Sequence, residues 1–117
     1  MQVFGIDNRL IINQKKLCNY DGNEHIDNVD WNIASPIEMI IVDCGRTLLV
    51  NDGWWNVFSP SFVKNKTLIV MQDWQTYKQI PDLHYNQTKI FTDSKLNQIE
   101  LIHELDGGSI ATFIYRG

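Results

Sequence analysis

Unbroken apolar runs, rather than regular alternation, dominate the hydrophobic pattern of this chain. Residues 39–42 read MIIV and residues 67–71 read TLIVM. A strand points successive side chains to opposite faces, so a continuous apolar run places apolar side chains on both. Residues 39–42 are therefore predicted to be a central strand, and residues 67–71 another strand that is buried on both sides.

The stretch at residues 37–58 predicts three consecutive strands joined by two tight turns. The predicted strands are residues 39–42, 47–50 and 54–58. The second turn reads Asn-Asp-Gly at residues 51–53, which is among the strongest short hairpin signals. If residues 54–58 form a strand, the adjacent Trp54 and Trp55 point to opposite faces, and at least one of them is expected in the core.

The remainder of the chain adds shorter elements. Strands are predicted at residues 2–6, 9–12, 89–92 and 110–115, and a short helix at residues 73–79. Residues 94–105 fit two patterns. Leu96, Ile99 and Ile102 share a helical face, whereas Ile99, Leu101 and His103 alternate as in a strand. The alternation is favoured, with a hairpin leading into residues 110–115, because short apolar runs discriminate poorly between the two.

The predicted fold is a single globular domain over residues 1–117, which is a length that suits one domain. Strands with two apolar faces need covering layers, and few helices are predicted. Sheet must then cover sheet, which gives a mainly β fold, an antiparallel sandwich or a small barrel-like meander. The alternative is an α+β fold with one helix at about residues 94–105 packed on an antiparallel sheet.

Charge and composition narrow the classes of partner. The chain has 10 Lys plus Arg against 14 Asp plus Glu, a net charge of −4, and its cations are scattered. Nucleic-acid binding needs several cations on one face, so it is not expected. No apolar run approaches the roughly 20 residues that span a bilayer, so no membrane insertion is expected. The N-terminus lacks the pattern of a signal peptide, which predicts a cytoplasmic protein or one already cleaved.

Catalytic and metal-binding signals are weak. His25, His84 and His103 lie in no metal signature, and there is no nucleophile elbow, phosphate loop or dinucleotide motif. Cys44 lies in a predicted turn beside Arg46, where a lowered pKa can make a thiol a nucleophile, but a half-buried inert thiol is the favoured interpretation. Two free thiols are likewise favoured over a disulfide with Cys18. We predict no enzyme activity, cofactor or metal.

An acidic stretch and the tryptophans supply the candidate binding residues. Four acids recur every three residues from position 21 to position 30, and the simplest interpretation of this stretch is a solvated loop. The functional interpretation is a docking surface for a basic partner. Tryptophans anchor many protein interfaces, and two lie in loop-like stretches. The predicted partner-binding residues are Asp21, Glu24, Asp27, Asp30, Trp31 and Trp74.

These observations favour a small, soluble, acidic protein-binding module. The profile is typical of inhibitors of other proteins, such as bacterial toxin-immunity proteins or inhibitors from phages and mobile elements, with a basic toxin or nuclease as partner. One alternative is a carbohydrate- or small-ligand-binding β module that uses exposed tryptophans. Another is an enzyme of unrecognised type. The oligomeric state stays open, because edge strands at residues 2–12 or 109–115 can pair across a twofold axis.

Overall fold

The computed structural model describes residues 31–44, 47–75, 87–105, 107 and 109–117. In chain order, the elements are β1 (Met39–Val42), α1 (Leu48–Phe58), the 3-10 turn η2 (Ser59–Ser61), β2 (Leu68–Gln72), α3 (Gln87–Ser94), β3 (Ile99–Glu104) and β4 (Ile110–Tyr115). This part of the chain is therefore an α+β domain, in which helices and strands pack together.

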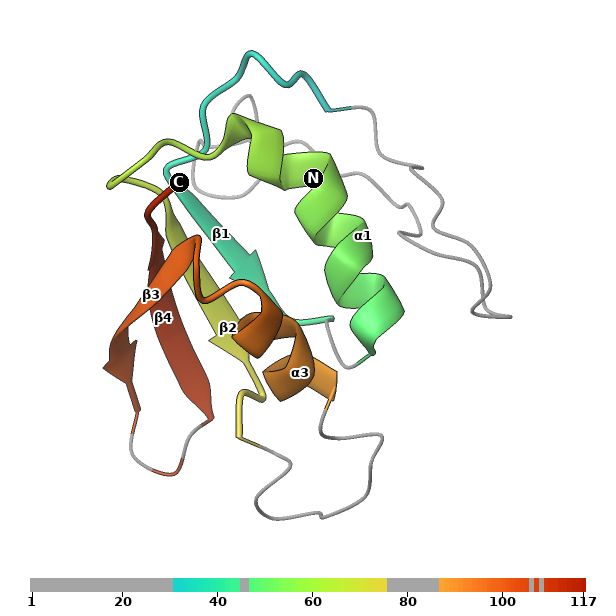
Figure 1. The fold of residues 1–117 in the computed structure, drawn as a ribbon, viewed down its shortest axis with the longest axis vertical. Helices are drawn as coiled ribbons and strands as arrows, with labels where there is room; N and C mark the ends of the chain where they lie inside the picture. Colours follow the sequence, from blue (N-terminus) through green and yellow to red (C-terminus); the bar gives the residue numbers. More distant parts are fainter. Residues whose placement is uncertain (1–30, 45–46, 76–86, 106, 108) are drawn as a thin grey trace, which may run out of the picture.

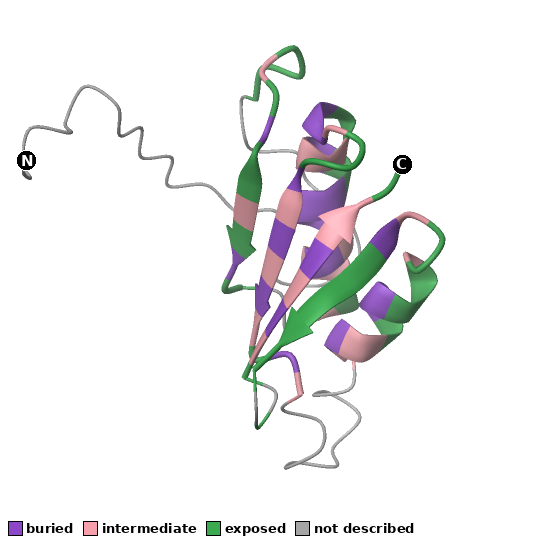
Figure 2. Ribbon diagram, turned by 90° about the vertical axis from the view of Figure 1, so that its left-hand side faces the viewer, coloured by how far each residue is buried: buried purple, intermediate pink, exposed green. Residues whose placement is uncertain are grey.

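The four strands form one mixed sheet in the order β1-β2-β4-β3. β1 and β2 are parallel, whereas β4 is antiparallel to both of its neighbours. A parallel pair needs a crossover connection, which α1 supplies. Both helices lie on the same side of the sheet (Figure 1), and Figure 2 views the opposite side, which no described helix covers. The arrangement is two layers, helices over sheet.

The prediction of three strands in residues 37–58 is wrong after the first. Residues 47–50 and 54–58 lie in or directly before α1, and the predicted hairpin turn at residues 51–53 is in the middle of the helix. Thr47 caps the helix, accepting a hydrogen bond from the backbone N–H of Val50 at 3.2 Å. The helix buries its sheet-facing side, which outweighs the turn preference of the Asn-Asp-Gly sequence.

Other elements confirm or correct the predictions individually. The strands at residues 39–42, 67–71 and 110–115 are confirmed within a residue, and residues 99–104 form the favoured hairpin with β4. The strand at residues 89–92 is wrong, because these residues lie in α3. Most of the predicted helix at residues 73–79, and the strands at residues 2–6 and 9–12, fall outside the described residues.

Of the two predicted fold classes, only the alternative, α+β, is confirmed, and only as a class. The described residues form neither a sandwich nor a barrel-like meander, because two helices take the place of the second sheet. The fold is α+β, but its helices are not at residues 94–105, and the sheet is mixed. Among the described strands, β1 lies at the edge of the sheet rather than at its centre, whereas β4 is an interior strand and therefore offers no edge for twofold pairing.

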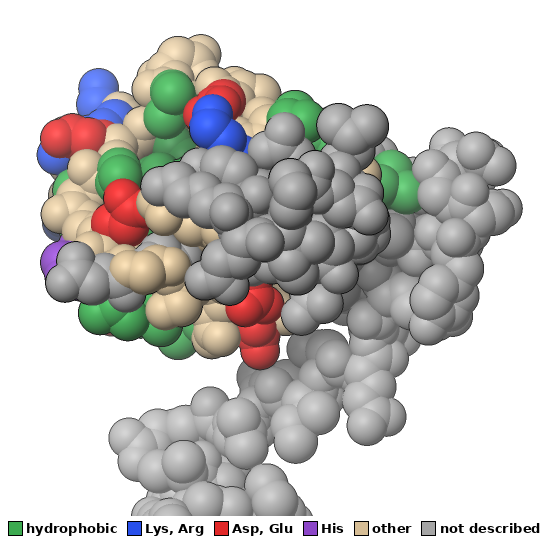
Figure 3. Space-filling view, turned by 90° about the horizontal axis from the view of Figure 1, so that it is seen from below, with side chains coloured by type: hydrophobic (Ala, Val, Ile, Leu, Met, Phe, Trp, Pro, Cys, Tyr) green, Lys and Arg blue, Asp and Glu red, His purple; other side chains and the backbone are tan. Residues whose placement is uncertain are grey.

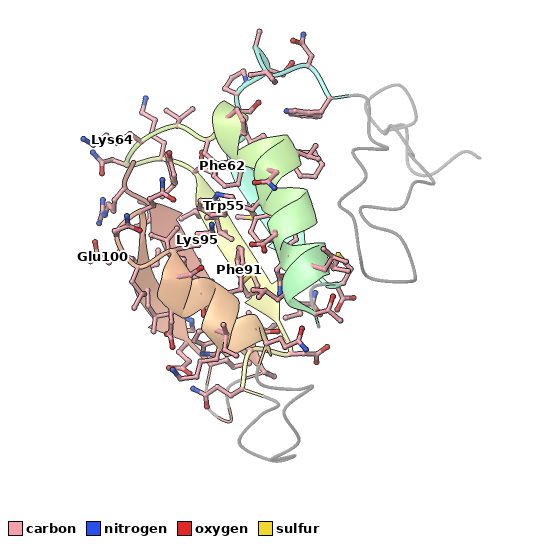
Figure 4. The ribbon with its side chains drawn as sticks, turned by 45° about the vertical axis from the view of Figure 1, so that its right-hand side comes forward. Trp55, Phe62, Lys64, Phe91, Lys95 and Glu100 are labelled. Atoms are coloured by element: carbon pink, nitrogen blue, oxygen red, sulfur yellow. The ribbon has the colours of Figure 1, made fainter. Side chains whose placement is uncertain are left out.

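Aromatic side chains fill the space between the helices and the sheet. Trp54 and Trp55 are both buried, so neither is the exposed tryptophan that the strand prediction allowed. Trp55 meets Phe62 and Phe91 edge to face, with ring centroids 5.6 and 5.9 Å apart. Figure 4 shows these rings between α1, α3 and the sheet, with Lys95 beside them. The Lys95 ammonium lies 5.1 Å from the Trp55 ring, a cation–π contact at the edge of the core.

Candidate functional site: an open apolar sheet face and the pocket beside it

The two faces of the sheet are assigned by the strand register. Residues directly opposite each other share a face, so the buried Ile69 and Phe113 mark the helix side. The alternate positions face away from the helices. On β1, β2 and β4 these open-face residues are Met39, Ile41, Leu68, Val70, Gln72, Ile110, Thr112 and Ile114.

On β1, β2 and β4 the open face is mostly apolar, where a solvated face is normally polar, whereas β3 places Glu100 and His103 on it. Antiparallel sheets with one face in water usually alternate apolar and polar residues along each strand. Here six of the eight open-face residues on these three strands are Met, Ile, Leu or Val. The side chains of Met39 and Ile41 are 52% and 60% exposed, and no described segment crosses this face in Figure 2. Leu68, Val70, Ile110 and Ile114 are partly exposed. An apolar surface that is accessible at its edge in this way is a candidate binding site.

An apolar pocket of about 330 Å³ lies beside this face, between β1 and α1. Its lining residues are Trp31, Ile37, Met39, Ile40, Ile41, Val42, Cys44, Trp54 and Phe58. None of these side chains is charged. Since β1 contributes both to the pocket and to the open face, the two surfaces are continuous around the outer edge of the sheet.

Trp31 is held in place at this pocket. Its indole N–H donates to Ser61 Oγ at 2.8 Å, and Ser61 Oγ in turn donates to the carbonyl oxygen of Ile33 at 2.8 Å. The Trp31 ring meets Phe58 edge to face at 5.4 Å between centroids. The side chain remains 37% exposed, so this predicted partner-binding residue is both ordered by contacts and accessible.

The second predicted anchor, Trp74, lies elsewhere. Trp74 is buried, packs edge to face on Phe113 at 5.3 Å, and donates its indole N–H to Glu104 Oε1 at 2.9 Å. Because β1 and β2 are parallel, Trp31 before β1 and Trp74 after β2 lie at opposite ends of the sheet. The structure therefore does not bring the two together, and Trp74 is a core residue. The predicted acids Asp21, Glu24, Asp27 and Asp30 lie outside the described residues.

The exposed residues of β1 were missed as site residues by the sequence analysis. The run at residues 39–42 correctly predicts a strand with two apolar faces, but it also predicts a central strand with both faces covered. In the structure β1 has a neighbour on one side only among the described strands, so Met39 and Ile41 are accessible. The apolar run at residues 39–42 is the sequence feature from which an exposed apolar strand could have been predicted.

The described residues offer no metal centre. No group of three or more His, Cys, Asp or Glu side chains in these ranges is placed to bind a metal ion. Cys44 is exposed rather than half-buried, and His103, on β3, is exposed as well. Cys18, its possible disulfide partner, lies outside the described part of the chain. No described helix is long and apolar enough to cross a membrane.

Surface charge in the described ranges is mixed. Figure 3 shows acidic, basic and apolar side chains interspersed on the end of the molecule seen from below. Two ion pairs join exposed groups of the described residues, Lys89 with Asp93 and Arg116 with Glu100. Comparison with known proteins finds no matching family model, no similar curated protein and no similar solved structure. The open face and the pocket are therefore the candidate functional surfaces.

Proposed function

We propose that this protein is a small protein-binding module that acts by covering a surface of another protein, as inhibitors and immunity proteins do. The observation that carries the proposal is the apolar open face, with Met39 and Ile41 more than half exposed at its edge. Burying such a face removes apolar surface from water, which is the main driving force of protein association.

The open face favours a protein partner over a carbohydrate. Sugar binding uses exposed aromatic rings with polar groups beside them. None of the open-face residues on β1, β2 and β4 is aromatic, and Trp54, Trp55 and Trp74 are buried. Trp31 is the one partly exposed tryptophan, and its pocket has an apolar lining. The apolar character of both surfaces suits aliphatic and aromatic side chains of a partner.

A basic partner, such as a toxin or nuclease, remains part of the proposal on grounds of charge. The chain carries a net charge of −4, and carboxylates steer a basic protein into encounter. Replacing Asp21, Glu24, Asp27 and Asp30 with Asn and Lys should slow association and reduce its salt dependence. Association kinetics that do not change would remove these four acids from the interface.

The decisive test places a charge in the centre of the open face. Val70 lies between Ile41 and Thr112 in the register. Val70→Lys should abolish affinity capture of a partner from the source organism and weaken binding of the purified partner at least about tenfold, because the ammonium is then desolvated. Ile90→Lys on α3 is the matched control, since Ile90 is 49% exposed and lies on the helical layer. Equal binding by both variants would refute the proposed face.

A further inference from the structure

The outer edge of β1 presents its backbone hydrogen-bonding groups. The N–H of Leu68 donates to the carbonyl oxygen of Glu38 at 2.9 Å, so Glu38 turns its backbone groups toward β2. Along a parallel ladder this direction alternates. Ile40 therefore also faces β2, whereas the N–H and C=O groups of Met39 and Ile41 face outward. Among the described strands, none pairs with that side.

The two edges of the sheet differ in how they are protected. Natural sheets block unwanted pairing with charged side chains, Pro or β-bulges on their edge strands. β3 has such protection, because Glu100, His103 and Glu104 lie along it and its register shifts between Leu101 and His103. β1 reads MIIV, without a charge, a Pro or a bulge. β3 therefore carries features that hinder pairing with a further strand, and β1 carries none of them.

A strand added to β1 would be accommodated on both of its faces. On the helix side, its side chains would meet the pocket lined by Trp31, Trp54 and Phe58. On the other side, they would extend the apolar open face beyond Met39 and Ile41. In strand addition the backbone hydrogen bonds give affinity, and pockets for alternate side chains give specificity. This edge offers both.

Charges at the two ends of β1 indicate what kind of strand fits. Glu38 and Asp43 bracket the strand, and both are exposed. Neither carboxylate forms an ion pair with a described residue. Antiparallel pairing with a second copy, centred on Ile40, would gather acidic side chains at each end and supply no cation. A segment with an apolar centre and a Lys or Arg at each end satisfies both carboxylates.

We propose that β1 receives an extended segment of a partner protein as a fifth strand of the sheet, with four apolar residues bracketed by basic ones. The inference deepens the proposed function, on which it rests, by naming how the partner is held. The backbone edge at Met39 and Ile41 supplies the pairing, the pocket receives side chains on the helix side, and Glu38 with Asp43 selects the basic ends.

The probe is the end-capped peptide TKVIFVKT, whose two lysines have the spacing of Glu38 and Asp43, with TEVIFVET as its acidic counterpart. In the full-length protein, titration of TKVIFVKT should slow amide hydrogen exchange at Met39 and Ile41. TEVIFVET should bind about tenfold more weakly, because it places like charges opposite each other. The double variant Glu38→Lys with Asp43→Lys should invert this preference and bind TEVIFVET more tightly. Nonspecific binding of the peptides to the apolar surface would not produce this inversion.

A backbone variant isolates the strand pairing itself. Ile41→Pro removes an N–H that faces away from β2, a position where an edge strand tolerates Pro. It should abolish peptide binding, whereas Ile41→Ala, which keeps the N–H, should retain most of it. If Ile41→Pro does not fold, the charge-inversion pair decides the matter alone.

Three outcomes would overturn the inference. The first is that neither peptide binds. The second is that the protein alone forms a dimer in sedimentation equilibrium. The third is that the amides of Met39 and Ile41 are protected from exchange before any peptide is added, which would mean that another segment already covers the edge. A natural partner that is lost with Val70→Lys but kept with Ile41→Pro would refute strand addition and leave the proposed function standing.

Discussion

The indole N–H of Trp54 donates to the side-chain oxygen of Asn51 at 2.9 Å, with both residues buried in α1. Asn51 is fully buried, and it sits three residues before its donor, at the spacing that places two side chains on one helix face. The bond explains how a residue typical of turns is accommodated in a helix interior. It also gives a buried indole its acceptor, which Trp needs in a core.

Asn51→Ala should lower the free energy of unfolding by about 1–3 kcal/mol, because the buried indole N–H of Trp54 loses this acceptor. Chemical denaturation measures the change. Asn56→Ala is the control, since Asn56 is exposed on the same helix and its loss should change stability by less than about 0.5 kcal/mol. Equal effects of the two substitutions would contradict the assigned role.

Thr47→Ala should destabilise the protein by about 1 kcal/mol, because the hydroxyl that caps α1 and accepts from the Val50 N–H is removed. Thr47→Ser keeps the oxygen and should be close to wild type. Thermal unfolding of the two variants gives the comparison, and an alanine variant as stable as the serine one would show that the cap is dispensable.

Thr67→Val tests a buried hydroxyl that joins three segments. Thr67 Oγ1 donates to the Ile37 carbonyl at 2.6 Å and accepts from the Val63 N–H at 2.7 Å, with Thr67 fully buried. Valine has nearly the same shape but leaves both backbone groups without this hydrogen-bond partner. The free energy of unfolding should therefore fall by about 1–3 kcal/mol. Thr67→Ser retains both bonds and should recover most of that loss in urea unfolding.

Trp74→Ala distinguishes a structural role from a partner contact. Trp74 is buried on Phe113, so its truncation should cost about 3–5 kcal/mol of stability. Trp74→Phe should retain most of the packing while losing the hydrogen bond to Glu104. If Trp74→Ala leaves stability unchanged and weakens partner binding, the result would support the prediction that Trp74 is a partner-binding anchor.

The sequence predicts the strands of this fold better than its helices. Residues 68–71 and 110–115 lie in interior strands. Their apolar runs predict a strand correctly, because both faces of the sheet are lined with apolar residues there. In residues 47–58 the same kind of run belongs to α1. Its helical spacing is masked by Asn51 and Gly53, whose turn preference is overridden by burial in the tertiary structure.

The candidate site could be predicted only in part. Trp31 was selected correctly as accessible, from its position in a loop-like stretch, whereas Trp74 in a similar context is buried. Local sequence does not say which loop folds back over the core. The exposure of Met39 and Ile41 depends on strand order, and strand order is a global property that a four-residue apolar run does not encode.

The position of β1 at the edge of the sheet has a consequence for local stability. β2 and β4 are bonded on both sides and contribute fully buried side chains, so their amides should open only with global unfolding. β1 is bonded on one side among the described strands and joins the sheet through a crossover rather than a hairpin. We expect native-state hydrogen exchange to rank β1 amides as the faster ones. The surface offered to a partner is thus also the part of the sheet that such a partner would rigidify most.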